Sequence, residues 1–305
     1  MVPETHRIEF AAMGGTTEIQ IARGDVADAM RVQALFAWHE RTMSRFVPES
    51  ELNALNASAP RAFEASPLLF DVVSDAIGWA CVTDGIFDPT VVDDVNAAGH
   101  AHGLVRTAQA PTAVLERVAT RRTSRWRAIS IDHDHETITL PPGVGIDLDG
   151  IGKGYTVDRA IAALGPGANA LVNASGDLYA AGDGPHGEGW YIGIQDPFGG
   201  ADDVAVLNVN DRGVATSGAT RHRAEVDARY IDVIDRRASA AASDLASVTV
   251  VAPTATLADV LAKTASVLGA REGLRFVERF SGAAAIAVTE RGDVLQTESA
   301  ADFLA

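Results

Sequence analysis

Residues 145–159 read GIDLDGIGKGYTVDR, and the character of the chain changes twice along them. Residues 146–149 alternate apolar and acidic side chains, which predicts a short strand. Three glycines at every second position, 150 to 154, then predict a turn. From Tyr155 to Leu164 apolar residues recur at helical spacing, and a Gly-Pro-Gly sequence follows. The stretch therefore predicts a strand that leads through a glycine-rich turn into a helix.

The turn carries one cation, Lys153, between Gly152 and Gly154. Backbone N–H groups exposed at such a turn, and the dipole of the helix that follows, favour an anion such as phosphate or diphosphate. The same residues would also make an ordinary tight connection between strand and helix, and the residues alone leave both interpretations open. The turn matches neither nucleotide fingerprint, because G-x-G-x-x-G is absent from it and a P-loop would need Ser or Thr where Gly154 stands.

The composition, net charge and cysteine content of the chain limit the classes of protein to which it can belong. The chain has 305 residues, of which 47% are apolar and 22% charged, as in a globular protein with a sizeable core. Its net charge of −16 argues against nucleic acid or an anionic membrane as a partner, so an anionic ligand would need a local positive site. The single cysteine, Cys81, excludes an internal disulfide.

The sequence contains no run near the roughly 20 apolar residues that a membrane span needs. The first residues contain neither the apolar segment of a signal peptide nor a cysteine that could carry a lipid. We therefore expect a cytoplasmic protein.

Strands outnumber helices in the pattern of the chain. Helices are expected over 25–46, 67–83 and 256–268, with a short capped turn at 50–56. Two long strand segments are expected, 6–22 with a break at 13–17 and 170–179 with a break at 175–177. Further strands are expected over 126–131, 137–140, 190–195, 204–209, 213–218, 230–234, 246–252, 276–280, 283–288 and 294–297. Most follow one another as hairpins, so we expect an α+β fold with largely antiparallel sheets and packed helices. No linker divides the chain, and we expect one domain over 1–305.

Polar residues collect in several turns at strand ends, where functional side chains often lie. In chain order the motifs are MGGTT at 13–17, SELNALN at 50–56, FDPT at 87–90, DLDGIGKG at 147–154, SGD at 175–177, TSG at 216–218 and SVTVVAP at 247–253, followed by ADVLAK at 258–263. Their order from 13 to 269 resembles that of the FAD:protein FMN transferases, the ApbE family. The resemblance rests on the order of the motifs, since no single one is decisive.

The resemblance implies a T-fold-like architecture and magnesium-dependent transfer of the FMN half of FAD to a Thr or Ser hydroxyl, with release of AMP. The partner would be an acceptor protein with an S/T-G-A-T type motif. By motif position, the resemblance assigns to the FAD site Met13, Phe46, Ile86, Phe87, Asp88, Asp147, Lys153 and Ile234. Gly150, through its main-chain oxygen, and Asp259 match positions of metal ligands.

The chain departs from the family pattern at two positions. Asp232 stands where the family has the histidine favoured as general base, and a carboxylate with its ordinary pKa near 4 is the weaker base at neutral pH. Lys263 stands where the family has a threonine metal ligand, one helical turn after Asp259, so it would face that aspartate. Lys263 would either take the place of Mg²⁺ or turn away from it. Besides transfer, the departures leave open an FAD-binding protein for storage or sensing, and hydrolysis of FAD to FMN and AMP.

Overall fold

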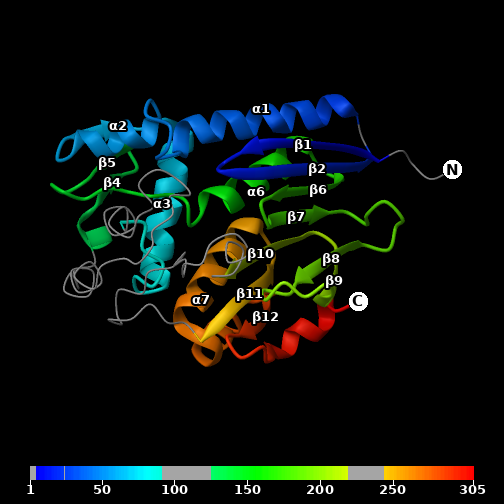
Figure 1. The fold of residues 1–305 in the computed structure, drawn as a ribbon. Coiled ribbons are helices and arrows are strands. Elements are labelled where there is room, and N and C mark those ends of the chain that lie inside the picture. Colours follow the sequence, from blue (N-terminus) through cyan, green and yellow to red (C-terminus); the bar gives the residue numbers. More distant parts are fainter. Residues whose placement is uncertain (1–4, 24, 91–124, 219–243) are drawn as a thin grey trace. The chain divides into compact units, whose positions relative to one another are not determined.

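The computed structural model describes residues 5–23, 25–90, 125–218 and 244–305. The chain divides into two compact units, whose helices and strands are labelled in Figure 1. The first unit comprises Met1–Ala37, Lys153–Ala224 and Ser243–Ala305, and the second comprises Trp38–Gly152 and Glu225–Ala242. The expectation of a single domain over 1–305 stays a prediction.

The first unit contains an eight-stranded sheet in which every neighbouring pair is antiparallel. The strands, in spatial order, are β1 (His6–Ala12), β2 (Gly15–Arg23), β6 (Asn169–Ala174), β7 (Asp177–Ala181), β10 (Arg212–Gly218), β11 (Leu245–Ala252), β12 (Ala284–Thr289) and β13 (Val294–Gln296). Two of the hairpins have two-residue loops, Met13-Gly14 and Ser175-Gly176, and all four residues have positive φ. Such loops match the twist of the strands that they join.

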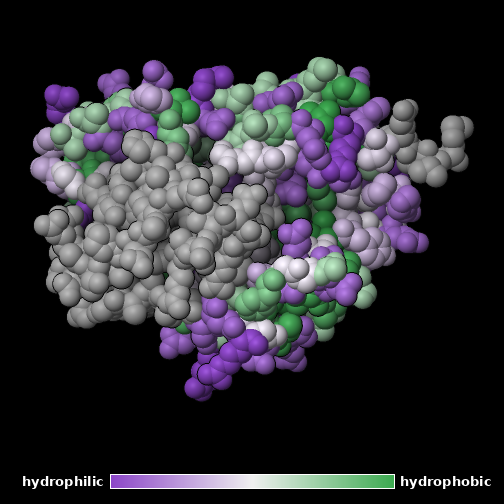
Figure 2. Space-filling model, viewed as in Figure 1, coloured by the Kyte–Doolittle hydropathy of each residue, from purple (hydrophilic) through white to green (hydrophobic). Residues whose placement is uncertain are grey.

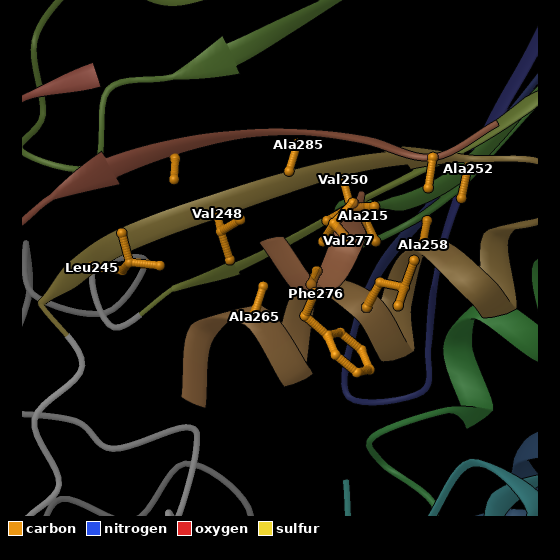
Figure 3. Close-up of a cluster of buried hydrophobic side chains, with 14 of the residues drawn as sticks. Ala215, Leu245, Val248, Val250, Ala252, Ala258, Ala265, Phe276, Val277 and Ala285 are labelled. Atoms are coloured by element: carbon orange, nitrogen blue, oxygen red, sulfur yellow. The ribbon is translucent and has the colours of Figure 1, made fainter. Parts of the chain in front are cut away.

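Helices cover one face of this sheet. They are the first half of α1 (Val26–Met43), α6 (Gly152–Leu164) and α7 (Ala255–Val277). Figure 3 shows Val248 and Val250 of β11 on the same side as Phe276 and Val277 of α7. Because side chains alternate along a strand, Val251 lies in the core on the opposite face. That second core is closed by β8 (Trp190–Gln195), β9 (Asp203–Val209) and the 3₁₀ helix η3 (Glu298–Phe303).

The second unit combines helices with a small sheet. Its described elements are the end of α1, α2 (Glu51–Ser58), β3 (Ala62–Glu64), α3 (Pro67–Val82), the 3₁₀ helix η2 (Arg125–Ala128), β4 (Ser130–Asp132) and β5 (Thr137–Thr139). The strands pair antiparallel in the order β3-β5-β4. Ser50 and Ser66 cap α2 and α3, and the Ser66 hydroxyl also donates to Glu51 at 2.6 Å. The sequence motif at 50–56 thus fixes where both helices begin.

The α+β class, the antiparallel sheets and most element positions are confirmed. The prediction of a strand before the glycine turn is wrong, because residues 145–149 form no strand. The Asn56 side chain bonds both the N–H and the C=O of Ile146, and the Asp147 N–H donates to Pro89 O at 2.8 Å. These partners satisfy backbone groups that a sheet would otherwise use.

Two further expectations are corrected. Residues 276–280 form no strand, because α7 is kinked at Gly269 and continues to Val277, burying Phe276 in the helix-side core. The first residues of 126–131 belong to η2 and not to a strand. The strand expected at 230–234 lies outside the described residues.

The described surface in Figure 2 mixes hydrophilic and hydrophobic residues. Exposed large apolar side chains include Met30 on α1 and Tyr191 on β8. Within the described part of the chain, no helix has the length and apolar character needed to cross a membrane.

Candidate functional site

The described residues that the resemblance assigned to the site divide between the two units. The first unit holds Met13, Lys153, Asp259 and Lys263. The second unit holds Phe46, Ile86, Phe87, Asp88, Asp147 and Gly150. Asp232 and Ile234 lie outside the described residues.

In the first unit, the charges of Lys153, Asp177 and Lys263 all act on the Asp259 carboxylate, and these four side chains are called here the charge cluster. The Lys153 ammonium lies 3.2 Å from Asp177 Oδ2, and the Lys263 ammonium pairs with Asp259 Oδ1. The carboxylates are deeply buried, at 6% and 1% exposure, whereas the two lysine side chains are 17% and 24% exposed. The formal charges of the cluster cancel, and its cations are the groups that solvent can reach.

Three elements of the first unit position this cluster. Lys153 lies in the first turn of α6 and Asp177 is the first residue of β7. Asp259 and Lys263 are one turn apart on α7, as the spacing of the sequence predicted. The helix α6 begins at Gly152, three residues before the expected start at Tyr155, so Lys153 is part of the helix and not of a loop before it.

Gly154 is required where α6 approaches α7. A Cβ atom at this position would lie 2.6 Å from the Ala255 carbonyl oxygen and 2.9 Å from Thr256 Cα, distances that real contacts do not show. The Gly154 N–H donates to Asp259 Oδ2 at 3.3 Å. The glycine therefore lets the two helices approach and supplies a second partner to the buried carboxylate.

Asp158 joins the same two helices. Its carboxylate accepts hydrogen bonds from the N–H groups of Ala255 and Thr256, both at 2.8 Å, and from the Thr256 hydroxyl at 2.5 Å. Thr254 caps α7 by accepting from Leu257 N at 3.1 Å. These bonds satisfy N–H groups that have no partner within the helix, and they fix the α7 start against α6.

The protonation of Asp259 is set by its surroundings. Burial raises the pKa of Asp259 to about 6, and the negative charge of Asp177 contributes to that rise. The ammonium groups of Lys263 and Lys153 oppose it. Above that pH the carboxylate is mostly ionised, so at neutral pH it meets Lys263 as a charged partner.

The groups that contact the Asp259 carboxylate decide whether it can bind the metal ion that the resemblance implies. Mg²⁺ takes octahedral oxygen ligands, usually including one or two carboxylates. Here one Asp259 oxygen contacts the Lys263 ammonium and the other accepts from Gly154 N–H. Across 5–23, 25–90, 125–218 and 244–305, no three His, Cys, Asp or Glu side chains are grouped so as to hold a metal ion. This arrangement does not fit Mg²⁺, because a cation of the chain already contacts the carboxylate.

In the second unit, Asp147 is held in one position. Its Oδ2 lies 2.9 Å from Arg45 Nε in an ion pair whose two side chains are 9% and 8% exposed. Its Oδ1 accepts from Asp149 N at 3.0 Å. The Asn56 bonds to Ile146 fix the preceding peptide. These contacts therefore hold the Asp147 carboxylate and the peptide before it in place.

The other second-unit residues differ in exposure. Asp88 Oδ1 accepts from the Thr90 N–H at 2.8 Å and from its hydroxyl at 2.6 Å, which shapes the FDPT turn. Phe87 is a core residue at 7% exposure, while Phe46 is 45% exposed. The Arg45 guanidinium lies 4.1 Å from the centre of the Phe46 ring. Of the two phenylalanines, Phe46 is thus the one that can offer an aromatic face to a ligand.

Met13, Ile86 and Gly150 are the other described positions that the resemblance assigned to the site. Met13 has φ +51 in the β1–β2 loop and packs against the core beneath α1 and α6. Ile86 is half-buried beside Phe87, and Gly150 is half-buried in the turn that precedes α6.

The sequence interpretation did not single out Arg45, Asp158 or Asp177 as site residues. Asp177 was visible as part of the SGD turn, but its partner lies in another motif. Arg45 precedes the assigned Phe46, and nothing in its sequence neighbourhood points to Asp147. Asp158 follows the glycine turn by one helical turn.

Comparison with known proteins gives one consistent family. Residues 13–287 match the model of the ApbE family. The FAD:protein FMN transferase of Escherichia coli (strain K12) is 27% identical, covering 98% of this chain and 90% of its own length. That of Haemophilus influenzae is 31% identical over 88% of this chain and 81% of its own. The solved apbe protein of Thermotoga maritima superposes with a TM-score of 0.86 at 25% identity, covering 98% of this chain and 99% of that one.

Proposed function

This chain belongs to the ApbE family, and from that premise we propose that it binds FAD and transfers the FMN half to a Thr or Ser hydroxyl of an acceptor protein, releasing AMP. The proposal extends to this chain the activity for which its relatives are named. The acceptor would carry an S/T-G-A-T type motif.

The observation that carries the proposal is the charge cluster on α6, β7 and α7. A protein with a net charge of −16 repels a diphosphate unless a local positive site offsets this charge. In the charge cluster, Lys153 and Lys263 are held by buried carboxylates, with their own side chains partly accessible. Although the formal charges of the cluster cancel, its two partly accessible ammonium groups can each form a charge-assisted hydrogen bond with a diphosphate.

The reaction we propose is one displacement at phosphorus. The acceptor hydroxyl oxygen attacks the FMN phosphorus, and a new P–O bond to the acceptor forms. The bond from that phosphorus to the bridging oxygen breaks, and AMP leaves with this oxygen. Negative charge develops on the leaving phosphate, where the ammonium groups stabilise it.

The hydroxyl proton goes to Asp232 in this proposal. The support for Asp232 is its position in the sequence, where the family has a histidine. Phe46, with its exposed ring, is proposed to contact a ring of FAD, and Asp88, Asp147, Ile86, Ile234 and Met13 are proposed to line the site. Phe87, which is buried, would support that lining from the core.

The experiment that tests the proposal follows both products. The purified protein is incubated with FAD and a peptide containing the S/T-G-A-T motif, with Mg²⁺ and separately with chelator. AMP is quantified by chromatography, and the peptide is analysed by mass spectrometry. AMP together with covalent FMN on the peptide supports transfer. AMP with free FMN indicates hydrolysis, and bound FAD without either product indicates a binding protein. Either of these last two results overturns the transferase proposal.

A further inference from the structure

We propose that the ammonium of Lys263 serves as the resident cation of this site, in place of the divalent metal that the family pattern puts beside Asp259. The chain would then bind the diphosphate of FAD without requiring a divalent ion. This inference rests on the proposed function, because it concerns how the same site offsets the charge of FAD.

The position of Lys263 is the first argument. Its ammonium contacts Oδ1 of Asp259, the aspartate that matches a metal-ligand position. Asp259 is 1% exposed, and its Oδ2 accepts from Gly154 N–H. A divalent metal ion that bound Oδ1 would have to displace the Lys263 ammonium. The two positive charges of the metal ion would then lie near the displaced ammonium. Repulsion between these cations opposes that exchange.

The charge of the cluster is the second argument. With Lys153 and Lys263 against Asp177 and Asp259, the cluster is formally neutral before an anion arrives. With threonine at 263, the same cluster would have a net charge of −1 and would repel a diphosphate. A cation would then be needed to offset that negative charge. In this chain the Lys263 ammonium offsets it without a metal ion and leaves the cluster neutral.

Accessibility is the third argument. The Lys263 side chain is 24% exposed although its partner is almost completely buried. The carboxylate therefore holds the ammonium from one side, while the lysine remains partly open to solvent. Lys153 has the same arrangement with Asp177, at 17% and 6% exposure. Both ammonium groups also act electrostatically on the same Asp259 carboxylate, so they belong to one site.

The test compares FAD affinity with millimolar Mg²⁺ and with chelator, measured by titration calorimetry on the natural protein and two variants. For the natural protein we expect the two dissociation constants to agree within about twofold. Lys263→Thr restores a hydroxyl, so we expect Mg²⁺ to tighten its FAD binding at least about tenfold, within the usual range of coupling between two ligands. Lys263→Arg keeps the positive charge and should remain insensitive to Mg²⁺.

The outcomes separate the two proposals. If Mg²⁺ tightens FAD binding to the natural protein by tenfold or more, the inference about Lys263 is overturned while the proposed function stands. If FAD does not bind in either buffer, the proposed function is overturned and the inference fails with it. Mn²⁺, followed by electron paramagnetic resonance in the presence of FAD, gives a second readout. We expect it to bind Lys263→Thr and not the natural protein, and binding to the natural protein would overturn the inference. The comparison on the natural protein is decisive even if Lys263→Thr does not fold.

Discussion

Lys153 and Asp177 form an ion pair across α6 and β7, with 3.2 Å between Nζ and Oδ2 and the carboxylate 6% exposed. If Lys153 is the partner of the FAD diphosphate, Lys153→Ala should weaken FAD binding by about 1.5–3 kcal/mol, the range for hydrogen bonds to charged groups. The variant also leaves the negative charge of Asp177 without this partner. Titration of FAD into both proteins measures the change.

A double variant separates these two contributions. Lys153→Ala with Asp177→Asn removes both charges, so part of the lost FAD affinity should return. An unchanged dissociation constant in Lys153→Ala would show that the diphosphate does not contact this lysine.

Substitution by alanine should change the free energy of unfolding in opposite directions at Gly154 and Gly78. Gly154→Ala places a Cβ against the backbone of α7 and should lower the free energy of unfolding by about 1–3 kcal/mol, as overpacking does. Gly78 lies inside α3, where an added Cβ atom would meet open space, so Gly78→Ala should raise stability by about 0.5–1 kcal/mol. Urea unfolding measures both, and a stable Gly154→Ala protein would contradict the close approach of the helices.

Asp158→Ala tests how the α7 start is held. The substitution removes the acceptor of three hydrogen bonds, two of them from backbone N–H groups. Leaving such donors unsatisfied should cost about 1–3 kcal/mol of unfolding free energy. A loss below about 0.5 kcal/mol would indicate that Thr254 alone secures this end.

The same aspartate makes stability depend on pH. Burial raises the pKa of Asp158 above its ordinary 3.8, and the hydrogen bonds from Thr256 and Ala255 oppose this rise. A carboxyl group with a raised folded-state pKa contributes stability that is fully present below 3.8 and is lost as pH rises through the folded-state value. The stability of the natural protein relative to Asp158→Asn, which does not titrate, should therefore increase as the pH is lowered toward 3.8. Urea midpoints across that window measure it, and a decrease would mean that the hydrogen bonds outweigh burial.

Asn56 offers a test in the second unit. Its side chain accepts from Ile146 N at 2.7 Å and donates to Ile146 O at 2.9 Å. Asn56→Ala should lower unfolding free energy by about 1–3 kcal/mol, since both backbone groups lose a partner. Asn56→Asp keeps the acceptor but sets a carboxylate oxygen against the Ile146 carbonyl oxygen, so its loss should be at least as large as that of Asn56→Ala. Equal stability of Asn56→Ala and the natural protein would contradict a fixed Asp147 loop.

Some of this architecture could be predicted because its causes are local. The glycines at 14 and 176 predicted a break in each of the two strand segments, and the structure shows that each break is a hairpin loop with positive φ. The spacing of Asp259 and Lys263 placed them on one helix face, which the ion pair confirms.

Other parts could not be predicted because their causes lie far away in the sequence. Residues 146–149 have the alternation of a strand, yet Asn56 takes the hydrogen bonds of Ile146. The glycines at 150–154 predicted a turn, and the sequence did not show that Gly154 lacks a side chain because α7 approaches it closely. Asp177 of β7 forms its ion pair with Lys153 of α6, which lies far away in the sequence. No local sequence pattern predicts this contact.

The central claim is that this protein recognises FAD through its diphosphate. The most direct measurement is a calorimetric titration of the natural protein with FAD, FMN and riboflavin under identical conditions. Two charged hydrogen bonds to the diphosphate contribute about 3 kcal/mol or more, so FAD should bind at least about a hundredfold more tightly than riboflavin. Comparable affinities for FAD and riboflavin would contradict the account.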